Sequence, residues 1–175
     1  ACLLAEGTSV IRNVPALSDV EILLAILREL GCRVERRPDG AVEIEVKDES
    51  NCTASYELVS KMRASVCVLG PLIGRRKKAR VSMPGGCVIG VRPIDQHLKG
   101  LEALGAKIRL DHGYVEAAGA PLVGARIAFD VNTVNGTQNV LMAATLAQGE
   151  TLIENAAREP EVTELADVLN RMGAE

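Results

Sequence analysis

Two stretches far apart in the chain follow the same pattern. Residues 3–8 read Leu3-Leu4-Ala5-Glu6-Gly7-Thr8, and residues 145–150 read Thr145-Leu146-Ala147-Gln148-Gly149-Glu150. Each is followed by a short apolar stretch ending in an Asn, and then by a helical pattern that ends at a Gly. Gly31 stands 24 residues after Gly7, and Gly173 stands 24 residues after Gly149. This agreement predicts an internal structural repeat.

A middle copy extends from residues 79–83 to residues 104–106 and is about two residues longer, with the excess around residues 85–87. In each copy, a helix ends at a Gly, a Val- and Ile-rich strand follows, and an amphipathic helix comes next. The first two copies add a pair of strands joined by turns at residues 38–40 and 111–113.

The predicted fold class is therefore α/β (α+β), with helices packed on small sheets. We expect one domain over residues 1–175, with units at about 1–47, 61–118 and 138–175. The copies look cut at both ends, and we expect a piece of a longer chain.

Composition excludes several function classes. The 175 residues are 47% hydrophobic with a net charge of −3, which is typical of a globular protein. No apolar run reaches 18 residues, so we expect no membrane partner. The three aromatic residues are too few for base stacking, so we expect no nucleic-acid partner and interpret the basic residues 74–80 as a solvated turn.

The five cysteines are odd in number and include no C-x-x-C pair. The sequence therefore predicts neither a disulfide framework nor a metal site. We expect Cys32 and Cys67 to be buried core residues. Free thiols suit a reducing compartment, which favours the cytoplasm.

One predicted loop contains residues that are suited to catalysis. Gly85 and Gly86 precede Cys87, and Arg92 precedes Pro93 at the expected start of a helix. A helix start favours anions. A thiol on an exposed loop beside a guanidinium can act as an acid or as a nucleophile.

Four stretches together resemble the enolpyruvyl transferase family, and within it the UDP-N-acetylglucosamine 1-carboxyvinyltransferases. They are residues 61–65, 69–72, 84–95 and 153–161. The resemblance covers nearly the whole chain. It implies one domain of a two-domain inside-out barrel, each domain built from three βαβαββ-type units.

The resemblance also implies a reaction. The enolpyruvyl group of phosphoenolpyruvate is transferred to the 3-hydroxyl of UDP-N-acetylglucosamine, and phosphate is released, as the first committed step of peptidoglycan synthesis. No cofactor is implied, and the second domain of the enzyme would be the protein partner.

By resemblance, Cys87 protonates the methylene carbon, can hold a covalent adduct and is alkylated by fosfomycin. Arg92 binds phosphate and Arg63 contacts the UDP-sugar. The implied substrate-binding set is Arg63, Arg92, Pro93, Ile94, Asp95, Gln96, Thr133 and Val134.

Residues 133–137 depart from the family's usual Ser-Val-Gly-Ala-Thr string, because Asn135 and Gly136 stand in its middle. We expect a surface or structural role for His97. Two alternatives stay open: a non-catalytic UDP-sugar-binding module, and an enzyme like enolpyruvylshikimate-phosphate synthase.

Overall fold

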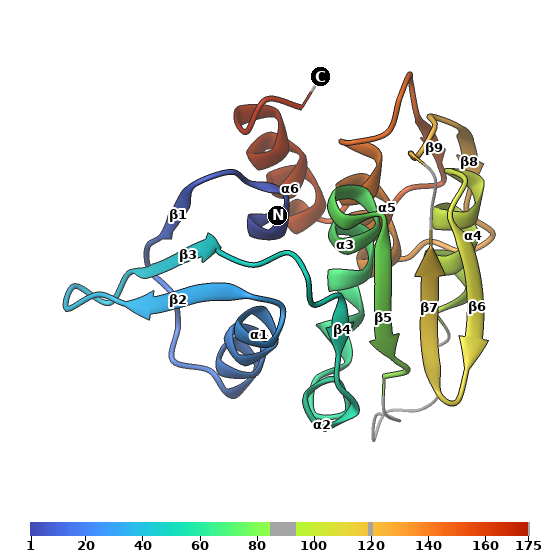
Figure 1. Cartoon of the computed structure of the whole chain (residues 1–175). Coiled ribbons are helices and arrows are strands. Elements are labelled where there is room, and N and C mark those ends of the chain that lie inside the picture. Colours follow the sequence, from blue (N-terminus) through green and yellow to red (C-terminus); the bar gives the residue numbers. More distant parts are fainter. Residues whose placement is uncertain (85–93, 119–120, 175) are drawn as a thin grey trace.

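The computed structural model describes residues 1–84, 94–118 and 121–174 (Figure 1). These residues form three separate sheets, with strand orders β1-β3-β2, β4-β5-β7-β6 and β8-β9. The strands are β1 (Thr8–Ile11), β2 (Cys32–Arg36), β3 (Val42–Val46), β4 (Thr53–Ala54), β5 (Lys78–Ser82), β6 (Lys107–Asp111), β7 (Tyr114–Ala118), β8 (Arg126–Ala128) and β9 (Leu152–Glu154).

Eight helical segments lie within the described part of the chain. The α-helices are α1 (Ser18–Glu29), α2 (Tyr56–Val59), α3 (Leu69–Arg76), α4 (Asp95–Ala103), α5 (Val134–Ala144) and α6 (Pro160–Arg171), and the 3₁₀ helices are η1 (Cys2–Leu4) and η2 (Arg63–Val68). None of these helices has both the length and the apolar character needed to cross a bilayer.

The predicted repeat is visible in the topology. In the first sheet β3 pairs antiparallel with both β1 and β2, and in the second β7 pairs in the same way with β5 and β6. The strands β4 and β8 each pair parallel with the next strand of the chain, β5 and β9, after a helical connection that consists of α2, η2 and α3 in the first case and of α5 in the second. A shared order of this kind is the βαβαββ pattern, and the predicted α/β fold class is confirmed.

Backbone conformation matches between the first and last copies. Gly31 and Gly173 are left-handed, with φ of +82° and +100°, and each follows a helix. Asn13 and Asn155 are also left-handed, with φ of 57° and 55°. Gly105, with φ of +96°, ends α4 in the same way, so the three predicted helix ends are confirmed.

The helices α3 and α5 lie between the two larger sheets (Figure 1). Glycine allows α5 to approach its neighbours closely. A Cβ on Gly70 of α3 would meet the Asn139 carbonyl oxygen at 2.1 Å, and one on Gly100 of α4 would meet Val140 Cγ2 at 2.3 Å. The core extends outward from this contact and includes Leu72, Leu101, Leu104, Val115 and Val140.

The expected unit bounds and the expected cysteine burial need comment. The last unit is expected to begin at about residue 138, whereas the helix before Gly149 begins at Val134 and has Thr133 as its N-cap. Cys32 is buried as expected, whereas Cys67 is only partly buried, so that expectation was wrong. The strand β8 lies before residue 138 and pairs with β9; the unit bounds themselves stay a prediction.

The basic residues 74–80 have local partners. Arg75 forms ion pairs with Glu6 and Glu49. Arg76 donates to the carbonyl oxygens of Asn51 at 2.5 Å and Leu30 at 2.8 Å. These cations lie at the C-terminal end of α3, where the helix dipole favours positive charge.

Candidate functional site

The predicted residues Cys87, Arg92 and Pro93 lie outside the described residues. The residues on either side of this segment are held by contacts with the rest of the protein. Before it, β5 runs to Ser82, and the Met83 amide donates to the Gly113 carbonyl oxygen at 2.8 Å. After it, Ile94 is 3% exposed and precedes the first residue of α4. The Ile94 side chain is therefore part of the core.

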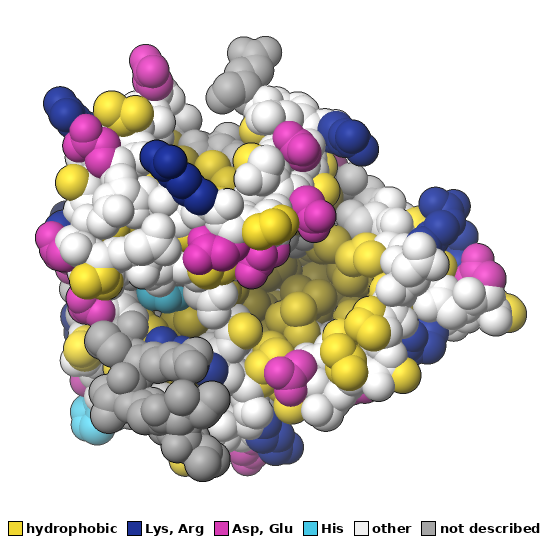
Figure 2. Space-filling model, turned by 180° about the vertical axis from the view of Figure 1, so that it is seen from behind, with side chains coloured by type: hydrophobic (Ala, Val, Ile, Leu, Met, Phe, Trp, Pro, Cys, Tyr) yellow, Lys and Arg dark blue, Asp and Glu magenta, His cyan; other side chains and the backbone are white. Residues whose placement is uncertain are grey.

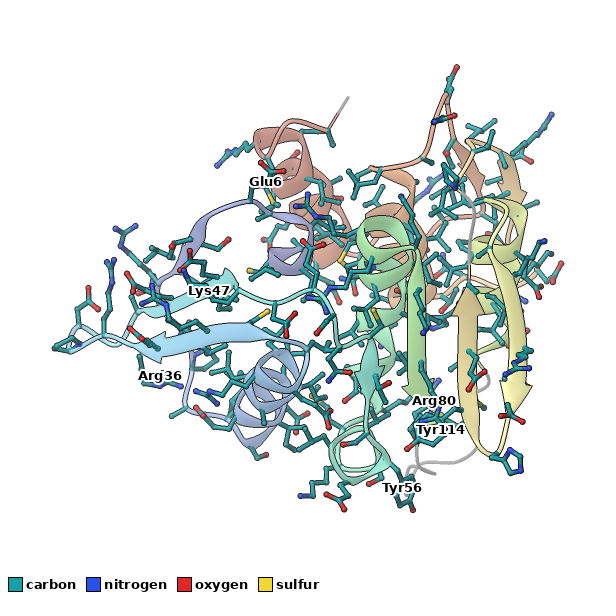
Figure 3. The ribbon with its side chains drawn as sticks, viewed as in Figure 1. Glu6, Arg36, Lys47, Tyr56, Arg80 and Tyr114 are labelled. Carbon is teal, nitrogen blue, oxygen red and sulfur yellow. The ribbon has the colours of Figure 1, made fainter. Side chains whose placement is uncertain are left out.

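A cation–aromatic contact lies near the start of this segment (Figure 3). The Arg80 guanidinium carbon lies 3.7 Å from the centroid of the Tyr114 ring, and Tyr114 is the β7 partner of Ser82. The Tyr114 hydroxyl accepts a hydrogen bond from the Tyr56 amide at 3.4 Å. These contacts connect the end of β5 to β7 and α2.

The first turn of α4 begins with a carboxylate. Asp95 is exposed, and its Oδ2 accepts a hydrogen bond from Gln96 Nε2 at 2.8 Å. A carboxylate in the first turn interacts favourably with the helix dipole. Asp95 is thus oriented by its neighbour and accessible to a ligand.

Gln96 itself is buried and bridges two segments. Its Nε2 donates to Asp130 Oδ2 at 3.1 Å, and its Oε1 accepts from the Asp130 amide at 2.9 Å. Hydrogen bonds from Lys99 and Gln96 lower the pKa of Asp130. The side chain of Gln96 therefore holds α4 against the segment that leads into α5.

The predicted residues Thr133 and Val134 begin α5. Thr133 is the N-cap, and its Oγ1 accepts a hydrogen bond from the Gly136 amide at 3.2 Å. A Cβ on Gly136 would meet Thr133 Cγ2 at 2.5 Å, so this Gly accommodates the cap. Thr137 Oγ1 in turn accepts from the Ala157 amide at 3.0 Å. The string at residues 155–161 therefore connects β9 to α6 and supports the start of α5.

Arg63 begins η2 and lies near His97 of α4. Burial, and secondly the positive charge of Arg63, lower the pKa of His97 to about 4, against an opposing effect of Asp95. His97 is 2% exposed, so of the two expected roles, surface or structural, the structure supports the structural one. It is neutral at physiological pH.

Asn139 joins these segments, and it was missed by the sequence analysis. Its amide contacts η2, α3 and α4 together, and the residue is fully buried. The available signal was a single Asn in an otherwise apolar face of a helical pattern. The structure thus brings together Arg63, the first turn of α4 and the first turn of α5.

A hollow in the surface is lined by other residues. Its volume is about 700 Å³, and Figure 2 shows it as an apolar surface with acidic side chains at the rim. It is lined by α1, β3, η2, α5 and α6, whereas Arg63, Asp95 and Thr133 do not line it. An apolar lining of this kind offers little to a charged nucleotide-sugar. In the described ranges, no group of three or more His, Cys, Asp or Glu side chains could hold a metal ion.

The fold and the converging helix starts define the class of protein. The structure of the enolpyruvyl transferase NikO from Streptomyces tendae matches 99% of this chain and 41% of its own, with a TM-score of 0.83 at 20% identity. The structure of EPSP synthase from Acinetobacter baumannii matches 92% of this chain and 38% of its own, with a TM-score of 0.70 at 21% identity. The fold is that of the enolpyruvyl transferases.

The chain belongs to the EPSP synthase (3-phosphoshikimate 1-carboxyvinyltransferase) family, whose sequence profile matches residues 1–175. Curated relatives of this chain have a narrower name than the family, UDP-N-acetylglucosamine 1-carboxyvinyltransferase. That of Myxococcus xanthus is 60% identical over 99% of this chain, and that of Geobacter metallireducens is 58% identical over 98%. The chain spans about two fifths of the length of these relatives, 42% and 41%.

Proposed function

We propose that this chain is part of a UDP-N-acetylglucosamine 1-carboxyvinyltransferase. The observation that carries the proposal is an identity of 55–60% to curated proteins of that name over 98–99% of this chain. The geometry supports it, because hydrogen bonds of Gln96 and Asn139 join α4 to α5, to the segment before it and to η2, the short helix that Arg63 begins. A cation, an exposed carboxylate and helix N-termini at one place suit a nucleotide diphosphate-sugar.

In the proposed reaction, the 3-hydroxyl oxygen of the sugar bonds to C2 of phosphoenolpyruvate and its proton passes to a base in the rest of the enzyme, while Cys87 gives its proton to C3 and becomes a thiolate. This yields a tetrahedral ketal. The C2–O bond to phosphate then breaks, C3 returns a proton to the Cys87 thiolate, and the base gives its proton to the leaving phosphate, so the products are the enol ether and inorganic phosphate. Arg92 stabilises the phosphate charge.

Each of the predicted binding residues has a proposed role toward the UDP-sugar. Arg63 binds the diphosphate-sugar. The backbone of Pro93 and Ile94 and the carboxylate of Asp95 contact the uridine. Thr133 and Val134 contact the sugar nucleotide at the start of α5, whereas Gln96 acts by orienting Asp95.

We also propose the pathway, the compartment, the inhibitor and the partner domain. The enzyme acts in peptidoglycan synthesis in the cytoplasm, fosfomycin alkylates Cys87, and a second domain of the same polypeptide completes the site. Because relatives are more than twice as long as this chain, further catalytic groups are expected in the rest of the enzyme.

The test is phosphate release from phosphoenolpyruvate by the whole polypeptide that contains this chain. Turnover is expected with UDP-N-acetylglucosamine, and Cys87→Ala should abolish both turnover and epoxide labelling. The 175-residue chain alone should release no phosphate, since each missing preorganised charge costs about 10²–10³ in rate. Turnover by the rigorously purified chain would show that the catalytic groups are misplaced here.

A second candidate is 3-phosphoshikimate 1-carboxyvinyltransferase activity, because the matching family carries that description. The same assay with shikimate 3-phosphate as acceptor separates the two. Turnover with shikimate 3-phosphate alone would favour this candidate. Tight binding of UDP-N-acetylglucosamine without turnover by the whole polypeptide would favour a non-catalytic binding module.

A further inference from the structure

A buried amide joins the elements that surround the proposed UDP-sugar site. We propose that Asn139 is a positioning residue that holds η2, α4 and the start of α5 in register, and so sets the affinity for the UDP-sugar. This inference rests on the proposed function. It adds a role for a residue that lies behind the contact surface rather than on it.

Three hydrogen bonds place the Asn139 amide. Its Oδ1 accepts from the Gly70 amide at 2.5 Å. Its Nδ2 donates to the Val66 carbonyl oxygen at 3.2 Å and to His97 Nδ1 at 3.0 Å. One fully buried side chain therefore connects α5 with α3, η2 and α4.

The partner histidine has one suitable protonation state. An amide Nδ2 can only donate, so His97 Nδ1 must accept and the ring proton must be on Nε2. A protonated ring could not accept this bond. The lowered pKa of His97, about 4, keeps the ring neutral and the bond intact at physiological pH.

A second bridge lies one residue before His97. Gln96 makes two hydrogen bonds to Asp130, three residues before Thr133. Two consecutive side chains of α4 are thus connected to the segment that starts α5. Both Asp95 and Thr133 are placed by these connections, and Arg63 is placed through Val66 of the same short helix.

Stability alone does not require this arrangement. A buried amide must lose its water, and an intramolecular hydrogen bond returns only about 1 kcal/mol net. Replacing both partners of a buried hydrogen bond with well-packed apolar groups is often close to neutral, which applies to the Asn139–His97 pair, whereas the Gly70 amide and the Val66 carbonyl oxygen are backbone groups that stay. A polar group with three directional bonds does specify one relative position of the helices, whereas apolar contacts tolerate sliding.

The experiment measures steady-state kinetics of the whole polypeptide with both substrates. Asn139→Leu has a similar volume and removes all three bonds. We expect it to raise KM for UDP-N-acetylglucosamine about tenfold, which corresponds to the loss of one or two hydrogen bonds. We expect kcat to change less than about threefold, since the reacting groups are elsewhere.

Val140→Ala is the matched control. Val140 is the next residue of α5, is fully buried and takes no part in the polar contacts. Its truncation should lower stability but leave KM unchanged. A purely structural defect reduces the fraction of active enzyme and hence kcat, so the two effects are distinguishable.

A pair of substitutions at His97 tests the same contact if Asn139→Leu does not fold. His97→Asn places an amide oxygen near the position of Nδ1 and should keep KM within about threefold, whereas His97→Leu should raise it about tenfold. Unchanged KM in folded His97→Leu or Asn139→Leu, or a fall in kcat alone, would overturn the positioning role and leave the proposed function intact. No turnover by the unmodified enzyme with UDP-N-acetylglucosamine would overturn both.

Discussion

The two larger sheets share a strand pattern but differ in what covers them. The sheet β4-β5-β7-β6 belongs to a closed side, where α3, α4 and α5 pack together and Leu101 and Val115 are completely buried. The sheet β1-β3-β2 and α1 form an open side, which faces the hollow of about 700 Å³. The helices also differ in length. In the second and third units α3 and α5 have 8 and 11 residues, whereas η1, the helix at the corresponding position of the first unit, has 3.

The comparison shows that the strand order of a sheet and the burial of its residues have different causes. Strand order follows from local signals, and the order β1-β3-β2 of the first sheet recurs as β5-β7-β6 in the second, where β4 is an additional edge strand. The inner face of the first sheet lies beside the hollow, which Val42 and Ile44 of β3 line although they are only 1% and 3% exposed. The predicted UDP-sugar contacts lie on the closed side, where rigid packing can hold them in place.

The largest expected effect is at the contact between α3 and α5. In Gly70→Ala, the new Cβ would lie 2.1 Å from the Asn139 carbonyl oxygen, so the backbone of α5 must move. We expect a loss of roughly 3 kcal/mol or more in the free energy of unfolding, measured by chemical denaturation.

Gly74→Ala is the control on the same helix. There the nearest atoms would lie 3.4 Å away, and Ala favours the helix by about 1 kcal/mol over Gly. We expect stability to stay equal or to rise. Equal losses in the two variants would contradict the close approach of α3 and α5.

Leucine truncations compare the two sides directly. Leu101→Ala on the closed side should cost about 3 kcal/mol, because it leaves a cavity among packed atoms. Leu24→Ala, on α1 beside the hollow, should cost less, about 2 kcal/mol, since Leu24 is 6% exposed and lines the hollow whereas Leu101 is fully buried. Denaturation of both variants gives the comparison, and a larger loss for Leu24→Ala would reverse the assignment of the sides.

The sequence predicts features that depend on neighbouring residues. Gly31, Gly105 and Gly173 end helices as expected, and the turns at residues 38–40 and 111–113 join the expected strands. Repetition then extends these local predictions to the order of the sheets. The family resemblance is confirmed by the family profile, which matches residues 1–175.

The candidate site was less predictable, because its contacts join distant residues. Asn139 meets His97 across 42 positions and Gly70 across 69. Gln96 stays a predicted substrate contact, and the motif that predicts it does not indicate the two hydrogen bonds that its side chain makes to Asp130. A motif identifies the segment that carries a site, whereas the direction of each side chain depends on tertiary packing.

The pH dependence of stability tests the burial of His97. Burial lowers its pKa from 6.5 to about 4, so above pH 6.5 the ring is neutral in both the folded and the unfolded chain. As pH falls from 6.5 toward 4, only the unfolded chain gains the proton, and the folded state loses up to about 3 kcal/mol of relative stability. Denaturation at several pH values should show this loss.

His97→Asn removes the titration while retaining an acceptor for Asn139. Its stability should therefore fall less than that of the unmodified chain over the same pH range. If both proteins lost equal stability between pH 6.5 and pH 4, carboxylates rather than His97 would account for the dependence.

The smallest expected effect is on the open side. Leu23 of α1 lines the hollow and is 37% exposed, and Asp19, Glu161 and Glu164 also line it. Leu23→Lys places a cation near these carboxylates, so the free energy of unfolding should change by no more than about 0.5 kcal/mol. The apolar area available to a dye should nevertheless shrink, and 8-anilinonaphthalene-1-sulfonate fluorescence should decrease. Leu110→Lys is the control, because Leu110 is 63% exposed on β6 and does not line the hollow. It should leave the fluorescence unchanged, and an equal decrease in both variants would mean that the dye binds outside the hollow.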